Sequence, residues 1–422
     1  MKNKFIYLLA TLIILSCQND NIEFDVLESA AKTHISTFIT LEKAINKADV
    51  ILTQLKDSSM TRSIPRSIKD VYCMTSTPLS RAGSGGNIPD TLLYLINYNE
   101  NKGFALLGAD KRLQEIYAIS DEGELNFSDT IDNIGLKIFF DMTRENIYRV
   151  LNVATPNKDI TGLFGHQTIL KIESRVEPYL WPEVRKWNQN YPYNKYCYTK
   201  EGQQAAVGCV AVAVLQIMSF YNCPEKLDGE RLSWRTMKKG TSNDAVAKLM
   251  RKLGNSDLLD MLYGTKESSA KFINTTRTFL QMGYKDVVGY TNCFDDYLVR
   301  NWLKGNEQDL GMKYGPVLMS GADRNAGGHS WVIDGYIRNA IYANSGADKD
   351  KYYFWSYDDT LYHCVWGFGG KSDGYFYFVH YDDGIMEQFD GPPALVGQGD
   401  NSDNLPYSFT DRIQLSTGYT PE

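Results

Sequence analysis

The apolar segment that follows Gly208 constrains the fold of this chain more than any other feature. From Cys209 onward it reads CVAVAVLQIMSFYNCP, with an apolar run of about twelve residues, which is longer than most strands. Asn222 and Pro224 supply a helix stop at its end. The segment therefore predicts a buried helix that begins at Cys209, although its valines would also suit a strand.

The position of Cys209 at a helix start has a chemical consequence. Unsatisfied N–H groups and the positive end of the helix dipole stabilise a thiolate there, so the pKa of the cysteine should fall towards the reactive range. Ala205, Ala206 and Gly208 precede it, and such small residues let a substrate backbone approach closely. Cys209 is therefore a candidate nucleophile.

A second informative stretch, AGGHSWVIDGY, covers residues 326–336. Gly327 and Gly328 end a loop, and His329 stands at the start of an alternating strand. His329 follows Cys209 by 120 residues (329 − 209), so the two can meet only through the fold. A cysteine and a histidine far apart in sequence are typical of cysteine peptidase sites. By contrast Asp334, His363 and His380 are expected to be structural or surface residues.

Composition limits the other possibilities. The 422 residues, 43% hydrophobic and 23% charged, predict a globular chain of two or three domains. The net charge of −7 argues against nucleic acid as a partner. No cysteine or histidine cluster has zinc-ligand spacing, so neither a metal nor another cofactor is expected. Of seven cysteines, five remain if Cys17 carries lipid and Cys209 stays a free thiol, so disulfides are not required.

The first residues are expected to form a targeting signal. Lys2 and Lys4 precede an apolar run at residues 5–15 that is too short to cross a bilayer and is followed by Ser16 and Cys17, as in a signal peptide. Residues 14–17 resemble a bacterial lipobox, which implies lipidation of Cys17 and attachment to a membrane. The alternative is an ordinary secretory signal cleaved near Cys17.

The stretch up to about residue 170 reads as a separate α+β unit. Residues 24–55 have a helical pattern, residues 56–89 read as a mobile loop, and residues 91–98 and 104–108 flank a hairpin signal that includes Gly103. Residues 171–178 are polar and read as an exposed inter-domain linker open to proteolysis.

Four stretches give the chain a resemblance to a known family. They are WNQ and PYN at 187–189 and 192–194, GQQAAVGCVAVAVLQIMSFYNCP at 202–224, residues 327–335, and VWGFGGKSDGYF at 365–376. In order and spacing they resemble the streptopain family of secreted bacterial cysteine peptidases. Residues 103–106 and 109–112 are similar to the propeptide of that family.

The resemblance implies an α+β fold: a papain-like peptidase domain with a helical lobe and an antiparallel β lobe, preceded by an α+β prodomain. The implied domains are a lipoprotein signal peptide at 1–17, an inhibitory prodomain at 18–172 and the peptidase domain at 173–422. Peptide or protein substrates and the chain's own prodomain are the implied partners, together with a membrane through the N-terminal lipid.

The resemblance also implies roles for individual residues. Cys209 attacks the scissile carbonyl, and His329 holds and later returns the thiol proton. The side chain of Gln189 and the N–H of Cys209 form the oxyanion hole. Trp366 matches a tryptophan that flanks the histidine. Val365 departs from the family, which commonly has Asn there, so another group such as a backbone carbonyl must orient His329.

The sequence thus predicts a secreted, lipid-anchored cysteine endopeptidase made as a zymogen. Two alternatives stay open. The Cys–His pair could cleave cell-wall amides or transfer acyl groups, or the chain could be an inactive binding lipoprotein, an idea supported only by Val365.

Overall fold

The computed structural model describes residues 37–56, 66–76, 89–152, 168–291, 294–305, 314–323, 327–344, 352–378 and 414–421. Residues 38–422 form one unit. The signal peptide and Cys17 lie outside the described residues, as do Cys293 and His380. No helix in the described part of the chain is long and apolar enough to span a bilayer.

An eleven-stranded antiparallel sheet organises the described residues. Its order is β1-β2-β3-β4-β12-β11-β10-β9-β13-β8, and β5 pairs with β10 beside this path. The strands are β1 Ile68–Thr75, β2 Thr91–Tyr98, β3 Phe104–Gly108, β4 Ile116–Ser120, β5 Thr168–Val176, β8 Tyr284–Thr291, β9 Val317–Asp323, β10 Gly327–Asn344, β11 Tyr352–Val365, β12 Gly374–Tyr377 and β13 Gln414–Pro421. The first four strands therefore join the later ones through β4 and β12.

The N-terminal strands carry two helices and two short 3-10 turns. These are α2 Leu41–Lys56, η2 Asn99–Asn101, η3 Phe127–Ile131 and α4 Ile134–Asn152. The helix predicted within residues 24–55 is confirmed from Leu41. Residues 37–40 are not helical, since Phe38 forms a β-bridge with Asp110, and the residues before 37 lie outside the described residues. The predicted hairpin is confirmed as β2 and β3, with Gly103 at φ 101°.

Two predictions for this half are wrong where the structure describes them. Ile68–Thr75, within the expected mobile loop, forms edge strand β1 and pairs with β2. Lys171 and its successors, expected to form an exposed linker, lie in β5 and pair with β10. The reason is that Lys171 and Glu173 occupy one exposed face while Ile172 is buried between them, so the polar composition belongs to one side of a strand.

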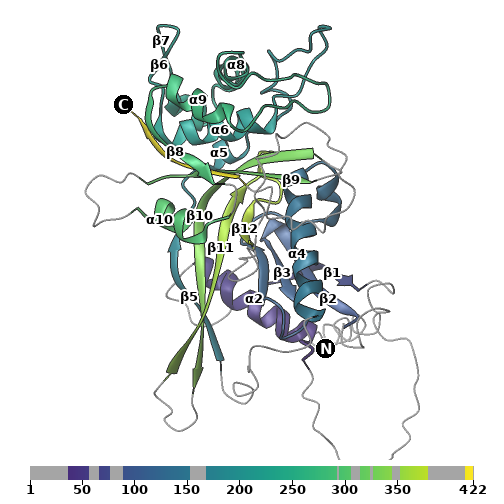
Figure 1. The fold of residues 1–422 in the computed structure, drawn as a ribbon. Coiled ribbons are helices and arrows are strands. Elements are labelled where there is room, and N and C mark those ends of the chain that lie inside the picture. The colour runs from purple at the N-terminus through teal and green to yellow at the C-terminus, as the bar shows by residue number, and fades with distance from the viewer. Residues whose placement is uncertain are drawn as a thin grey trace, which may run out of the picture. The chain divides into compact units, whose positions relative to one another are not determined.

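A helical half surrounds the segment from which the sequence analysis began. It contains α5 Pro182–Arg185, α6 Cys209–Tyr221, α7 Trp234–Lys238, α8 Asn243–Leu253 and α9 Asn274–Gln281, with a small hairpin of β6 Lys226–Leu227 and β7 Glu230–Arg231. The remaining helix, α10 Asp296–Lys304, packs near β9, β10 and β13. Figure 1 shows α5, α6, α8 and α9 gathered at one end of the long strands β10 and β11.

The predicted buried helix is confirmed as α6, and it ends with Asn222 in the left-handed conformation. Most of its residues lie in a hydrophobic cluster with α7, α8 and α9 that reaches Val332 of β10 and Val365 of β11. The helix can be apolar on all sides because helices and sheet enclose it.

The N-terminal strands and the later part of the sheet share a second hydrophobic cluster. Leu136 and Phe139 of α4 lie in it together with Trp331 of β10 and Phe376 of β12. The apolar residues of the expected α+β unit therefore do not form a hydrophobic core of their own in this cluster, because they pack together with residues of β10 and β12.

Candidate active site

Cys209 is the first residue of α6, and Gly208 sets the approach to it. Gly208 has φ 94°, a conformation that favours glycine. A Cβ at this position would lie 2.2 Å from Cε of Met261 and 2.9 Å from the carbonyl oxygen of Ser268. Any side chain here would therefore displace the loop that packs beside the thiol.

The sulfur of Cys209 reaches strand β10. The backbone N–H of Ser330 donates a hydrogen bond to Sγ over 3.4 Å, so the residue next to His329 touches the thiol. Burial raises the pKa of Cys209, against the opposing effect of N–H groups from Ser330, Val210 and Cys209 itself. The expectation of a lowered pKa is therefore wrong for this form of the protein, because surrounding protein disfavours the thiolate more than the helix start stabilises it.

His329 lies on β10 and is only 3% exposed. Its Nε2 is 2.9 Å from the carbonyl oxygen of Trp366. A carbonyl oxygen can only accept, so Nε2 carries the proton and Nδ1 is left as the acceptor. Burial lowers the pKa of His329 to about 4, although the Trp366 carbonyl acts in the raising direction. The imidazole is therefore neutral in this form.

Aromatic rings enclose the imidazole. The ring of Phe368 lies 5.3 Å from that of His329 between centroids, and the ring of Trp331 lies 6.1 Å away and stacks on it. Trp366 is fully buried and packs on Trp331 at 5.2 Å. Trp366 thus reaches His329 through its carbonyl, while Phe368 supplies the flanking ring that the sequence analysis had assigned to Trp366. Among the described residues there is no hydrogen bond between the imidazole and the thiol.

Gln189 lies on the segment that leads into the same region. Its carbonyl accepts a hydrogen bond from Val207, two residues before Cys209, over 2.9 Å. Its neighbour Asn188 forms a β-bridge with Phe368. The backbone therefore ties Gln189 to both the cysteine and the histidine side of the site, and its side chain is partly exposed.

Helix α4 of the N-terminal half covers the histidine. A Cβ built on Gly135 would lie 2.6 Å from Cδ2 of His329 and 2.7 Å from Cε3 of Trp366. Gly135 thus lets the helix backbone lie directly on the imidazole and the indole. Nothing in the sequence analysis marked this residue, because a single glycine near a helix start carries no signal for a contact 194 residues away (329 − 135).

Polar contacts hold the same two regions together beside the site. The hydroxyl of Ser372 donates to Oδ2 of Asp129 in η3 over 2.8 Å. Nη1 of Arg185 lies 2.7 Å from Oε1 of Glu122. These contacts and the β4–β12 pairing place the N-terminal half against residues 366–376.

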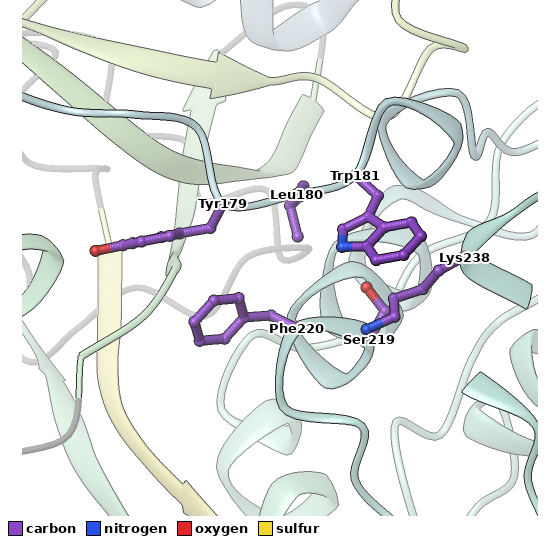
Figure 2. A pocket seen from close by; sticks show the side chains of 6 residues that line it. All are labelled: Tyr179, Leu180, Trp181, Ser219, Phe220 and Lys238. Atoms are coloured by element: carbon purple, nitrogen blue, oxygen red, sulfur yellow. The ribbon is translucent and has the colours of Figure 1, made fainter. Parts of the chain in front are cut away.

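A pocket of about 150 Å³ lies elsewhere, at the far end of α6. Figure 2 shows its lining residues: Tyr179, Leu180, Trp181, Ser219, Phe220 and Lys238. Ser219 and Phe220 belong to the last turn of the helix that begins at Cys209, roughly 16 Å away at 1.5 Å per residue. This pocket is therefore not part of the thiol site.

The other residues weighed in the sequence analysis lie apart from the thiol. His363 and Asp334 are buried, with Nδ1 of His363 2.6 Å from Oδ1 of Asp334. Within the described part of the chain, no group of His, Cys, Asp and Glu residues is arranged to hold a metal ion. Among the described cysteines, Cys197, Cys209 and Cys364 are free thiols.

Comparisons with known proteins bear on both halves of the chain. Residues 187–376 match the Peptidase C10 family, and residues 28–147 match the Spi protease inhibitor family. Streptopain of Streptococcus pyogenes is 25% identical over 342 residues, which cover 71% of this chain and 80% of that protein. The thiol protease/hemagglutinin PrtT of Porphyromonas gingivalis is 26% identical over 284 residues, covering 58% of this chain and 31% of PrtT.

Two solved structures are also similar. A fragment of prointerpain A of Prevotella intermedia has a TM-score of 0.47 and 19% identity, covering 84% of this chain and 99% of that chain. Active interpain A of the same organism has a TM-score of 0.35 and 20% identity, covering 59% of this chain and 96% of that chain.

The class of the protein follows from the matched residues and from the two halves that carry them. It is a cysteine endopeptidase with a helical half and an antiparallel half, preceded by an inhibitor-like prodomain. Residues 187–376 carry a Peptidase C10 domain, and the streptopain and PrtT relatives support the streptopain resemblance of the four sequence stretches.

Proposed function

We propose that the chain is a secreted, lipid-anchored zymogen in which Cys209 is the nucleophile, His329 the acid–base partner and Gln189 an oxyanion donor. The observation that carries this proposal is the packing of Gly135 in α4 on the imidazole of His329. A peptidase whose histidine is covered by its own inhibitor-like segment has a structural reason to be latent.

The proposed chemistry begins with the tautomer of His329. Nε2–H is bonded to the Trp366 carbonyl, so Nδ1 takes the thiol proton and the carbonyl stabilises the imidazolium that forms. The Cys209 thiolate then attacks the peptide carbonyl. The negative oxygen receives hydrogen bonds from the Gln189 amide and the Cys209 N–H, each worth on the order of 3 kcal/mol. His329 returns its proton to the leaving amine, and water hydrolyses the thioester.

Latency follows from the same burial. The pKa of Cys209 is raised and the pKa of His329 is lowered in the covered form, which favours a neutral thiol beside a neutral imidazole. Removal of α4 would admit water and substrate to both groups. The ion pair, and with it the nucleophile, would then form more readily.

Processing is proposed near residues 171–175, the position predicted from the sequence. These residues pair with β10, and a peptidase cleaves backbone that has left its sheet. We therefore expect β5 to separate from β10 before cleavage. N-terminal sequencing of the fragments formed by wild type and by Cys209→Ser will locate the cut and tell whether it is autocatalytic.

Lipidation of Cys17 and an extracytoplasmic location are proposed from residues 1–17. Radioactive palmitate should label the protein in cells, and Cys17→Ala should abolish the label. Retained label in that variant would contradict lipidation at this residue.

The central experiment compares full-length and processed protein on a casein substrate. We expect processed wild type to cleave casein, full-length protein to be much slower, and Cys209→Ser to be inactive. Equal rates for the full-length and processed forms would contradict the zymogen. Zymography on peptidoglycan tests the amidase alternative, and labelling by an epoxide inhibitor of papain-like enzymes, lost in Cys209→Ala, tests the inactive binding protein.

A further inference from the structure

We infer that Asp373 is a positioning residue for His329, which it orients through the backbone of Trp366. This inference deepens the proposed function and rests on it, because it takes His329 to be the acid–base partner of Cys209.

Two hydrogen bonds connect Asp373 to the imidazole through Trp366, and a third holds Trp366 to the neighbouring Ser372. The backbone N–H of Trp366 donates to Oδ1 of Asp373 over 3.1 Å. Its indole N–H donates to the carbonyl of Ser372 over 3.1 Å. Its own carbonyl oxygen lies 2.9 Å from Nε2 of His329. Ser372 and Asp373 thus hold Trp366 at two points, and the carbonyl of Trp366 accepts the hydrogen bond from His329.

The chain after Trp366 is tied to Asn188 by the β-bridge at Phe368, but Gly367 separates this bridge from the Trp366 carbonyl. Gly367, Gly369 and Gly370 follow, all with positive φ values between 76° and 81°, and glycine gives a backbone the widest conformational freedom. Val365 offers no polar side chain to the imidazole. The direction of the Trp366 carbonyl therefore depends on the anchors that Ser372 and Asp373 provide.

The burial of Asp373 argues that this contact has a substantial effect. The residue is 7% exposed, and its Oδ2 has no hydrogen-bond partner among the described residues. Burial raises the pKa of Asp373 to about 7, with Asp334 acting in the same direction and His363, the Trp366 N–H and Arg185 in the other. A buried carboxyl group with one free oxygen is costly, and its described hydrogen bond is the one to the Trp366 peptide.

Loss of this anchor has a specific expected consequence. A rotated Trp366 peptide no longer accepts from Nε2, so the imidazolium of His329 loses a stabilising partner and its pKa falls. The ion pair with Cys209 then breaks at lower pH. The charged group acting on the thiol, besides the imidazolium, is Glu267, which disfavours the thiolate and is unchanged by the substitution. Substrate contacts are also unchanged, so turnover rather than KM should respond.

The test uses the full chain, processed to its active form, with three variants. Asp373→Ala removes the acceptor, and Asp373→Asn keeps an oxygen that can accept from Trp366. Asp334→Asn is the matched control, because Asp334 is also a buried carboxylate but bonds to His363 and to the N–H of Leu180. We measure kcat and KM on a fluorogenic peptide and the pH profile of kcat/KM, with circular dichroism and Tm for folding.

We expect Asp373→Ala to lower kcat by about tenfold or more, since one orienting hydrogen bond to a charged group is lost, with KM within about twofold of wild type. The basic limb of its pH profile should move to lower pH. Asp373→Asn should restore most of the turnover and return the basic limb to its wild-type pH. Asp334→Asn should lower Tm and leave the limb where it is in wild type.

The inference is overturned if folded Asp373→Ala keeps the wild-type kcat and basic limb. It is also overturned if this variant and Asp334→Asn lower kcat alike without moving the limb, since Asp373 then has only a structural role. Should Asp373→Ala not fold, Asp373→Glu, which displaces the acceptor, must show the same shift of the limb. A wild type that never cleaves peptides contradicts the proposed function instead.

Discussion

Two buried histidines on paired strands have opposite surroundings. His363 of β11 has a carboxylate partner, Asp334, at 2.6 Å and the edge of the Tyr375 ring at 5.0 Å. His329 of β10 is surrounded by a backbone carbonyl and two aromatic rings, and the next residue, Ser330, is hydrogen-bonded to the thiol of Cys209. A carboxylate partner is the commoner mark of a catalytic histidine, yet it is His329, and not His363, whose neighbour Ser330 is hydrogen-bonded to the thiol of Cys209.

On the proposed function, proximity to the thiol of Cys209, and not a carboxylate partner, marks the reactive histidine. Asp334 also binds the N–H of Leu180, where the chain enters the helical half, which makes the His363 pair a structural connection. The surroundings of His329 connect instead to elements of both halves, α6, β11 and α4. The predictions below test this contrast.

The largest expected effect is on kcat, and it distinguishes His329 from His363. His329→Ala should lower kcat about 10⁴-fold or more, because the proton acceptor of the nucleophile is lost. His363→Gln should leave kcat per folded molecule within about threefold of wild type while lowering Tm, because a buried pair is broken. Initial casein hydrolysis by equal amounts of folded, processed protein measures both. An equal loss in folded His363→Gln would remove the distinction.

The next effect concerns Gln189, the proposed oxyanion donor of the His329 site. Gln189→Ala should lower kcat about 10²-fold with little change in KM, since one oxyanion donor is removed. Gln203→Ala is the matched control, because this exposed glutamine lies on the segment leading into Cys209. Peptide hydrolysis at saturating substrate measures the loss, and an unchanged kcat in Gln189→Ala would show that another group binds the oxyanion.

A smaller effect tests the role of helix α4, which covers His329 but not His363. Gly135→Val places side-chain atoms against the imidazole and the Trp366 indole, so the full-length protein should hydrolyse a peptide about tenfold faster, as overpacking destabilises the covered form. Arg144→Ala changes an exposed position of the same helix and serves as control. Early rates are measured before fragments appear on gels. A Gly135→Val variant as latent as wild type would show that α4 does not cause latency.

The smallest effect is a pH dependence of stability that His329 should produce. Its pKa is about 4 in the covered form against an ordinary 6.5, so the unfolded chain binds more protons between these values. The contribution of the neutral His329 imidazole to the free energy of unfolding is therefore complete above pH 6.5. It is lost as the pH falls towards 4, and the loss is on the order of 2 to 3 kcal/mol. The raised pKa of Asp373 acts in the opposite direction below pH 7.

The comparison that isolates His329 uses full-length Cys209→Ala, which cannot process itself, with and without His329→Gln. Urea midpoints at pH 7, 5.5 and 4.5 should fall more steeply when His329 is present. If the urea midpoints of the two proteins change with pH in parallel, the protonation of the His329 imidazole is not coupled to the unfolding of this region.

Local patterns in the sequence were sufficient for several elements. The helix at Cys209 and the hairpin around Gly103 were predicted because an apolar run, a stop signal and a glycine turn act within a few residues. The same local reasoning misread residues 68–75 and 171–176, whose polar residues occupy the exposed face of paired strands. Pairing with a partner strand decides such cases, and the partner lies far along the chain.

The sequence by itself determined which thiol and which imidazole stand out, because Cys209 and His329 lie in segments with specific composition and order. Only the tertiary structure decided how they are held. The carbonyl of Trp366, the ring of Phe368, the backbone at Gly135 and the carboxyl group of Asp373 reach this region from separate elements. Their contacts depend on distances between segments far apart in sequence. Burial among those segments, which no local pattern encodes, also changes the pKa of both reactive groups.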